Sequence, residues 1–119
     1  MSEKRATDPA SAVPLVRRHV SLSDALAKLP GPNDERYAAV FLKEGLEVEI
    51  FAPRGHDPQQ PHTRDELYVV ISGRGTFWNG TSRHPVGPGD FIYVPAGVPH
   101  RFEDFSEDFA VWGIFLGTP

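Results

Sequence analysis

From Tyr37 to the C-terminus the chain consists of short runs of Val, Ile, Leu, Phe, Tyr and Trp, each interrupted by Gly, Pro or Asn. Runs of this length and composition are typical of β-strands joined by tight turns, not of helices. The pattern predicts an all-β fold, either a barrel or a sandwich. We expect strands near residues 37–43, 46–52, 66–71, 75–79, 81–86, 91–94, 99–105 and 109–116.

The segment before these strands predicts one short helix. Ser21 is a suitable N-cap, Asp24 gives an acidic first turn, and Pro30 ends the run. The apolar residues that recur at helical spacing are Leu22, Ala25, Leu26 and Leu29. Residues 1–12 are small, polar and charged and predict a disordered tail, so that residues 13–119 would form a single domain.

Two local patterns predict details of the sheets. The alternation in Leu46–Ile50 indicates a strand whose apolar side chains face a core while Glu47 and Glu49 face water. Asn79-Gly80 predicts a two-residue type I′ hairpin turn, because both residues accept positive φ angles. We therefore also interpret the glycosylation-like triplet beginning at Asn79 as a turn.

Composition excludes several classes of protein. The 119 residues carry a net charge of −4, which offers no basic surface for nucleic acid. No apolar run approaches the roughly 20 residues of a membrane span, and no secretory signal is evident, so we expect a cytoplasmic protein. The chain has no cysteine, so a metal would be held by nitrogen and oxygen donors.

Two blocks suggest such a metal site: His62-x3-Glu66-x6-Gly73 and Gly89-x5-Pro95-x-Gly97-x2-His100. Side chains alternate between the faces of a strand, so Gln60, His62 and Glu66, which have the same parity, would share a face. A second strand would supply His100. Two imidazoles, a carboxylate and an amide oxygen from Gln60 suit a first-row divalent metal and leave room for substrate.

These blocks resemble the paired motifs of the cupin superfamily, written approximately as G-x5-H-x-H-x3,4-E-x6-G and G-x5-P-x-G-x2-H-x3-N. The resemblance covers residues 46–116. This chain differs in having Gln60 where the first motif histidine is expected, Gly55 one residue closer than the pattern asks, and Asp104 in place of the last Asn. His56 has the right parity to compensate for the missing histidine if the segment bends.

The resemblance implies a single jelly-roll β-barrel that binds a divalent Fe, Mn, Ni, Zn or Cu ion. It also implies a homodimer, in which the segment before Ser21 lies across the neighbouring barrel. Loss of metal is expected as the pH falls through the histidine range, because histidine must be neutral to bind a metal.

Parity also predicts the surroundings of the site. With Glu66 pointing inward, Tyr68 and Val70 would do the same, and Phe102 would follow His100. Further aromatic residues expected in the wall of the cup are Trp78, Tyr93, Trp112 and Phe115. Arg64 also has inward parity and is the arginine that we expect to contact substrate. His19 and His84 lie outside the blocks and are interpreted as surface residues.

Three functional classes fit this pattern. The protein would be an oxidative enzyme such as a dioxygenase, a non-oxidative metalloenzyme such as an isomerase or decarboxylase, or a binding module for a sugar or aromatic metabolite. In either enzyme, Glu66 would be both ligand and candidate base, and Tyr68 or Tyr93 a candidate proton donor.

Overall fold

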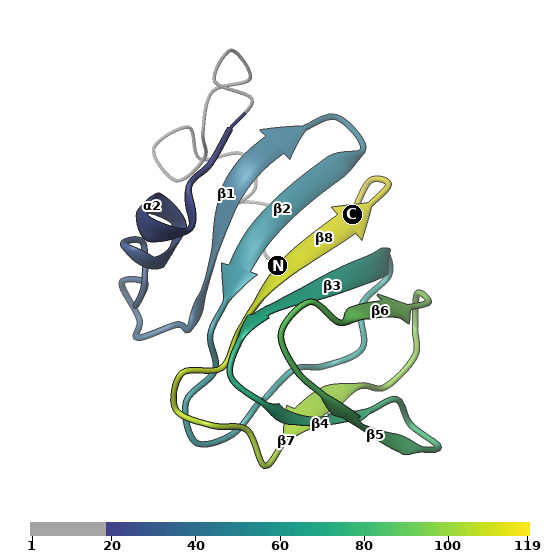
Figure 1. Ribbon diagram of the computed structural model, residues 1–119. Coiled ribbons are helices and arrows are strands. Elements are labelled where there is room, and N and C mark those ends of the chain that lie inside the picture. The colour runs from purple at the N-terminus through teal and green to yellow at the C-terminus, as the bar shows by residue number, and fades with distance from the viewer. Residues whose placement is uncertain (1–18) are drawn as a thin grey trace.

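A computed structural model describes residues 19–119, which form one short helix and eight strands (Figure 1). The elements are α2 (Leu22–Leu26), β1 (Tyr37–Lys43), β2 (Leu46–Phe51), β3 (Asp65–Ser72), β4 (Gly75–Trp78), β5 (Arg83–Val86), β6 (Phe91–Val94), β7 (Arg101–Glu103) and β8 (Ala110–Leu116). This confirms the predicted all-β class, and every strand begins and ends within two residues of its expected bounds. The predicted tail and the expected domain start lie outside the described residues.

The strands form two antiparallel sheets that face each other. The five-stranded sheet has the order β1-β2-β8-β3-β6, and the three-stranded sheet has the order β5-β4-β7. In the larger sheet, the register places Glu49, Gly113 and Tyr68 side by side in one row across β2, β8 and β3. The neighbouring row contains Glu47, Phe115 and Glu66. These rows lie on the inner face of the sheet and carry the polar side chains of the site.

An apolar core closes the space between the two sheets. Its buried members are Phe51, Tyr68, Val70, Phe77, Val86, Val94, Phe102, Phe109 and Val111. The rings are tilted against one another, as for Phe77 and Phe102, whose centroids are 5.2 Å apart. Aromatic pairs in such arrangements add stability beyond the area they bury. The core therefore packs directly beneath the polar side chains of the inner face.

Helix α2 packs on the outer face of the larger sheet, beside β1 and β2 (Figure 1). The Ser21 side chain accepts a hydrogen bond from the Asp24 N–H at 3.0 Å, which confirms the predicted N-cap. Ala25 is fully buried against Val40 and Ile50. The outer face of this sheet is thus apolar because a helix covers it.

This arrangement contradicts the predicted facing of β2. Glu47 and Glu49 are 2% and 6% exposed and point into the barrel, whereas Val48 and Ile50 pack in the outer cluster with α2. Alternation shows that a strand has two unlike faces but not which of them points inward. Here the helix supplies an apolar partner on the outside, so the polar face of β2 lines the interior.

The turn after β4 also differs from expectation. Trp78 pairs with Arg83, so four residues connect β4 and β5, and the Asn79 N–H donates to the Ser82 carbonyl at 3.1 Å. The Asn79 side-chain oxygen accepts from the N–H groups of Thr81 and Ser82. The prediction of a two-residue type I′ turn was wrong, because the Asn79 side chain stabilises a longer turn.

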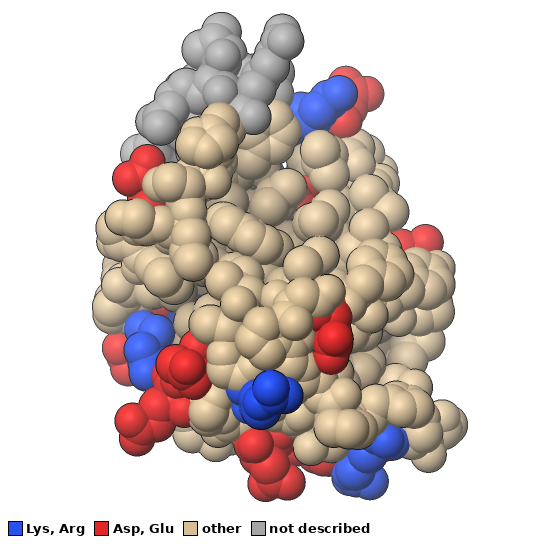
Figure 2. All heavy atoms as spheres, in the orientation of Figure 1, with Lys and Arg blue, Asp and Glu red and all other residues tan. Residues whose placement is uncertain are grey.

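Within residues 19–119, no helix has the length and apolar character needed to cross a bilayer. On the face drawn in Figure 2, Lys and Arg side chains lie among Asp and Glu side chains. The described part of that face shows no broad basic patch.

Candidate metal centre and its pocket

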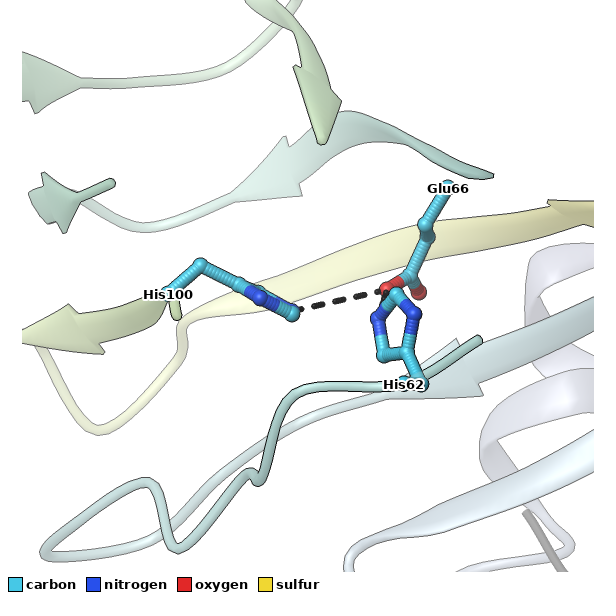
Figure 3. Close-up of side chains that lie close together, drawn as sticks. All are labelled: His62, Glu66 and His100. Atoms are coloured by element: carbon cyan, nitrogen blue, oxygen red, sulfur yellow. Dashed lines mark hydrogen bonds and ion pairs between the residues drawn. The ribbon is translucent and has the colours of Figure 1, made fainter. Parts of the chain in front are cut away.

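Three separate segments bring His62, Glu66 and His100 together (Figure 3). Glu66 lies on β3, His62 in the segment before it, and His100 immediately before β7. The Gly97 N–H donates to the His62 carbonyl at 2.7 Å, a backbone hydrogen bond that joins the two sequence blocks directly. Their convergence is therefore a property of the backbone as well as of the side chains.

Both imidazoles are oriented in the same way. The Nδ1 atom of His62 lies 2.8 Å from the Arg64 carbonyl, and that of His100 lies 2.9 Å from the Val98 carbonyl. A carbonyl oxygen only accepts, so each Nδ1 carries the proton, and in the neutral ring each Nε2 presents its lone pair. The Nε2 atoms of His62 and His100 lie 2.9 Å and 3.7 Å from Glu66 Oε1.

Glu66 is 1% exposed and occupies a space that only glycine on β8 leaves open. A Cβ atom at Gly113 would lie 2.8 Å from Glu66 Oε2 and 3.2 Å from Glu49 Cγ. The carboxylate therefore lies directly against the β8 backbone. Gly113 forms a cradle that fixes where Glu66 can point.

The electrostatics of this cluster favour charge separation. Burial raises the pKa of Glu66, but His100, His62 and Tyr68 outweigh it, so the pKa of this carboxyl lies below its ordinary value. Burial lowers the pKa of His100, but Glu66 and the Val98 carbonyl bring it above its ordinary value. The cluster thus has an anionic carboxylate and a strong preference for positive charge beside it.

The residues present fit a divalent metal. The three ligand atoms lie within 4.8 Å of one another. His100 Nε2 is buried and has no hydrogen-bond partner among residues 19–119, although a buried nitrogen without a partner is costly. Two imidazole nitrogens and one carboxylate oxygen, with the second nitrogen of each ring anchored by a carbonyl, are donors that suit such an ion. His62, Glu66 and His100 are therefore positioned to bind a metal, as their spacing predicted.

A pocket of about 700 Å³ opens beside this cluster. Its lining comes from the segments before β1 and after β2 and from the inner face: Asp34, Glu35, Arg36, Tyr37, Glu49, Phe51, Pro53, Arg54, His56, Pro58, Gln59, Gln60, Pro61, His62 and Phe115. His62 is thus shared by the metal site and the pocket. The ring of Phe115, an expected wall residue, packs edge-on against the imidazole of His62, with 5.0 Å between the ring centroids.

The segment around residue 60 differs from a regular strand. Gln60 is exposed and lines the pocket, and His56 is likewise exposed there. The amide that contacts the inner face belongs to Gln59, which accepts a hydrogen bond from the Tyr68 hydroxyl at 2.7 Å. Asp57, 7% exposed, anchors this segment by accepting from the Phe102 N–H at 2.8 Å. Metal coordination by Gln60 or His56 stays a prediction.

Arg64 points inward, as parity predicted, but its guanidinium is already paired. It donates to Glu47 at 3.0 Å and lies 4.5 Å from the centroid of the Phe115 ring. The Arg64 carbonyl also accepts from His62 Nδ1. Within residues 19–119, Arg64 therefore acts as a support for His62.

Three of the expected wall residues do not face the site, so that part of the prediction was wrong. Tyr93 is 52% exposed and pairs with Leu67 on the outer face of the larger sheet. Trp112 packs in the outer cluster with α2. Trp78 lies opposite the core residue Phe77 in parity and stacks with Arg101, whose Cζ is 4.1 Å from its ring. Its side chain follows the outer face of β4.

Phe102 and Tyr68 do point inward. Phe102 is 1% exposed, and its centroid is 5.0 Å from that of Tyr68, so it belongs to the floor and not to the pocket wall. Burial and the nearby Glu66 raise the pKa of Tyr68 well above its ordinary value, so its hydroxyl keeps its proton. Of the two candidate proton donors, only Tyr68 lies near the metal ligands. His19 and His84 are exposed, as expected.

Sequence reasoning missed four polar residues of the interior: Glu47, Glu49, Asp57 and Gln59. The available signal for Glu47 and Glu49 was their shared parity on one strand, which was assigned to the wrong face. Asp57 and Gln59 lie in a segment between prolines, where parity has no meaning because the backbone is not extended as a strand. Side-chain positions there follow from hydrogen bonds such as that of Asp57 with Gln59.

Two motif positions that are not candidate ligands, Gly73 and Asp104, are explained by their backbone conformation. Gly73 has a φ of 77°, and a Cβ there would lie 2.6 Å from Phe109 Cα. Asp104, which replaces the motif Asn, has a φ of 50°. Asp and Asn both adopt this left-handed conformation more readily than other side chains, so the replacement keeps the turn.

The fold and cluster define a small antiparallel β-barrel with a candidate metal site on its inner face. The family model described as a cupin domain matches residues 47–114, and the chain belongs to the cupin family. An uncharacterized protein of Streptomyces coelicolor is 36% identical over 94 residues, or 77% of this chain and 90% of that protein.

Two further likenesses are more distant. The dimethylsulfoniopropionate lyase DddQ of Ruegeria pomeroyi is 27% identical over 70 residues, or 57% of this chain but only 35% of the lyase. A solved structure of unknown function from Rhizobium leguminosarum has a TM-score of 0.63 at 20% identity and covers 85% of this chain and 97% of its own. This last likeness concerns the fold alone.

Proposed function

We propose that this cupin is a metal-dependent enzyme that acts on a small molecule bound in the pocket beside His62. The observation that carries the proposal is the pair of anchored imidazoles, His62 and His100, that present Nε2 to the buried carboxylate of Glu66. This arrangement adjoins a pocket of about 700 Å³, within the usual range of small-molecule sites.

The chain's own residues would hold the metal and prepare the substrate. His62, Glu66 and His100 would be the ligands, with Gln60 as a candidate fourth. A bound divalent ion would supply Lewis-acid chemistry at a substrate oxygen or, if redox-active, O₂ chemistry. Tyr68, which keeps its proton and donates a hydrogen bond to Gln59, would hold the Gln59 amide in place at the floor of the site. Phe115 would exclude water from one side.

The reaction class has two candidates, an oxidative dioxygenase type and a non-oxidative isomerase or decarboxylase type. The similarity to a lyase of Ruegeria pomeroyi supports the presence of an enzyme in this branch of the family, over the matched segment. O₂ consumption separates the two classes, because only the oxidative reaction requires it. Ligand-dependent stabilisation without product formation would instead indicate a binding module.

The experiment is elemental analysis of untagged protein purified without added metal, beside His100→Ala. We expect near-stoichiometric Fe, Mn, Ni, Cu or Zn in the parent and its loss in the variant. His84→Ala is the matched control, since this histidine of β5 is exposed and its ring lies 3.1 Å from the Ser82 hydroxyl, outside the candidate metal site. A parent protein that lacks metal and takes none up on titration would reject the proposal.

We also propose a homodimer, as the family resemblance implies. Size-exclusion chromatography with light scattering tests this at micromolar concentration. A mass of one chain throughout the peak would contradict it.

A further inference from the structure

Two arginines line the pocket beyond the metal ligands. Arg36 lies just before β1 and Arg54 after β2, and both face the same pocket as His62. Arg36 Nε donates to the Ala52 carbonyl at 2.9 Å, and Arg54 Nη1 donates to the Glu107 carbonyl at 2.7 Å. Among residues 19–119, neither guanidinium lies within ion-pair distance of a carboxylate. The pocket thus contains two cations held in place by carbonyl groups.

The two arginines line one pocket, and the charge of Arg54 affects Arg36. The pKa of Arg36 lies below its ordinary value because of burial and, second, because of Arg54. Asp34 acts in the opposite direction but more weakly than Arg54. Holding like charges together costs free energy unless an anion lies between them.

The acidic residues that line the same pocket are Asp34, Glu35 and Glu49. Glu35 Oε1 accepts from the Asn33 N–H at 2.7 Å, within its own turn. Glu49 lies on the inner face beside Gly113, next to the metal ligands. Asp34 and Glu35 directly precede Arg36, so the side of the pocket formed by the segments before β1 and after β2 carries charges of both signs. On the pKa of Arg36, however, Arg54 has a larger effect than Asp34.

Arg36 is held in a fixed orientation for binding. Its carbonyl accepts from the Ala52 N–H at 2.9 Å, while its Nε donates back to the Ala52 carbonyl at the same distance. This double contact aligns the guanidinium plane. A planar guanidinium binds carboxylate and phosphate through two parallel hydrogen bonds, so a fixed plane favours an oxyanion.

We propose that Arg36 and Arg54 form an oxyanion-binding subsite, which takes the carboxylate or phosphate group of the substrate. The reacting part of that substrate then lies toward His62. The assignment of a reacting end rests on the proposed function, whereas anion binding by the two arginines does not require a metal. Arg64, which sequence parity favoured for this role, is engaged by Glu47.

The test is a titration of isotopically labelled protein with inorganic phosphate and, separately, acetate, followed by NMR at constant ionic strength. The side-chain Nε–H signals of Arg36 and Arg54 report on the subsite directly. Arg36→Gln and Arg54→Gln are each compared with Arg83→Gln. Arg83 is exposed and pairs with Glu103 at 2.7 Å, and it does not line the pocket. Arg83→Gln changes the net charge of the protein by the same amount as each pocket variant.

We expect at least one of the two anions to shift the signals of Arg36 and Arg54. That anion should bind about tenfold more weakly to each pocket variant, a loss of about 1.4 kcal/mol, because each variant lacks a charge-assisted hydrogen bond. Arg83→Gln should bind as the parent does. Comparing phosphate with acetate shows which head group the subsite prefers. Arg54 is exposed, so Arg54→Gln keeps the test valid if Arg36→Gln does not fold.

Equal binding in all four proteins, or an equal loss in Arg83→Gln, would overturn the subsite. The titration is repeated with His100→Ala, whose metal content is measured separately. Anion binding that disappears in His100→Ala would place the anion on the metal and also overturn the subsite. Arginine-dependent binding in a parent protein without metal would support the subsite and reject only the metalloenzyme.

Discussion

Replacing Gly113 by alanine tests whether the β8 cradle positions the Glu66 carboxylate. The added Cβ would lie 2.8 Å from Glu66 Oε2, and an ordinary contact begins at 3.4 Å, so the oxygen must retreat by about 0.6 Å. Metal–ligand distances tolerate deviations of about 0.2 Å. The displaced carboxylate therefore cannot keep its position relative to His62 and His100.

The expected loss is one of metal affinity and not of folding. Gly113 does not have a positive φ, so alanine fits its backbone. The two obstructing atoms, Glu66 Oε2 and Glu49 Cγ, belong to flexible side chains and not to the backbone. Changes in the residues that orient metal ligands typically reduce affinity about 10- to 100-fold, which corresponds to about 1.4–2.8 kcal/mol. We expect the free energy of unfolding of the metal-free protein to change by less than about 1 kcal/mol, since Gly→Ala also restricts the unfolded chain.

Competition titration against a chromophoric chelator measures the affinity, and urea unfolding of the metal-free protein measures stability. Gly87→Ala is a closely matched control: it lacks a positive φ, and its Cβ would lie 2.8 Å from Arg74 Nη1, another flexible side-chain end. Parental affinity in Gly113→Ala would refute the argument that the cradle positions a ligand. An equal loss in Gly87→Ala would show that the effect is not local to Glu66.

Two further predictions concern the buried charges. Arg64→Met should lower the free energy of unfolding by about 3–5 kcal/mol, because it leaves Glu47 buried without its cation. The double variant Arg64→Met with Glu47→Leu should recover most of this loss. Urea unfolding measures both, and additive losses would contradict the coupling between the two residues. Metal should be released as the pH falls, because the imidazoles must be neutral to bind it. Since the pKa of His100 lies above 6.5 in the metal-free protein, protons begin to compete with the metal for His100 while the pH is still above 6.5. Elemental analysis after dialysis at stepped pH checks this, and full retention of the metal at pH 4 would count against the site.

The sequence alone was sufficient for the elements whose signals are local. The N-cap of α2 at Ser21 follows from the chemistry of one side chain and one backbone N–H. The convergence of His62, Glu66 and His100 was predicted from strand parity and from the resemblance of the two blocks to the cupin motifs. In the structure His62 and His100 lie just before β3 and β7, and the backbone hydrogen bond between Gly97 and His62 joins the two blocks.

The tertiary structure decided which face of each strand is inside and which polar groups are paired. Val48 and Trp112 lie outside because α2 covers that face, and no pattern within β2 or β8 contains this information. Likewise, the guanidinium of Arg64 is paired with Glu47, which lies 17 positions away on β2. Alternation and turn chemistry act over a few residues, whereas facing and pairing depend on which distant segment packs against a strand. The sequence therefore predicted the cluster of His62, Glu66 and His100 that is positioned to bind a metal, and the packing of the layers decided which residues surround it.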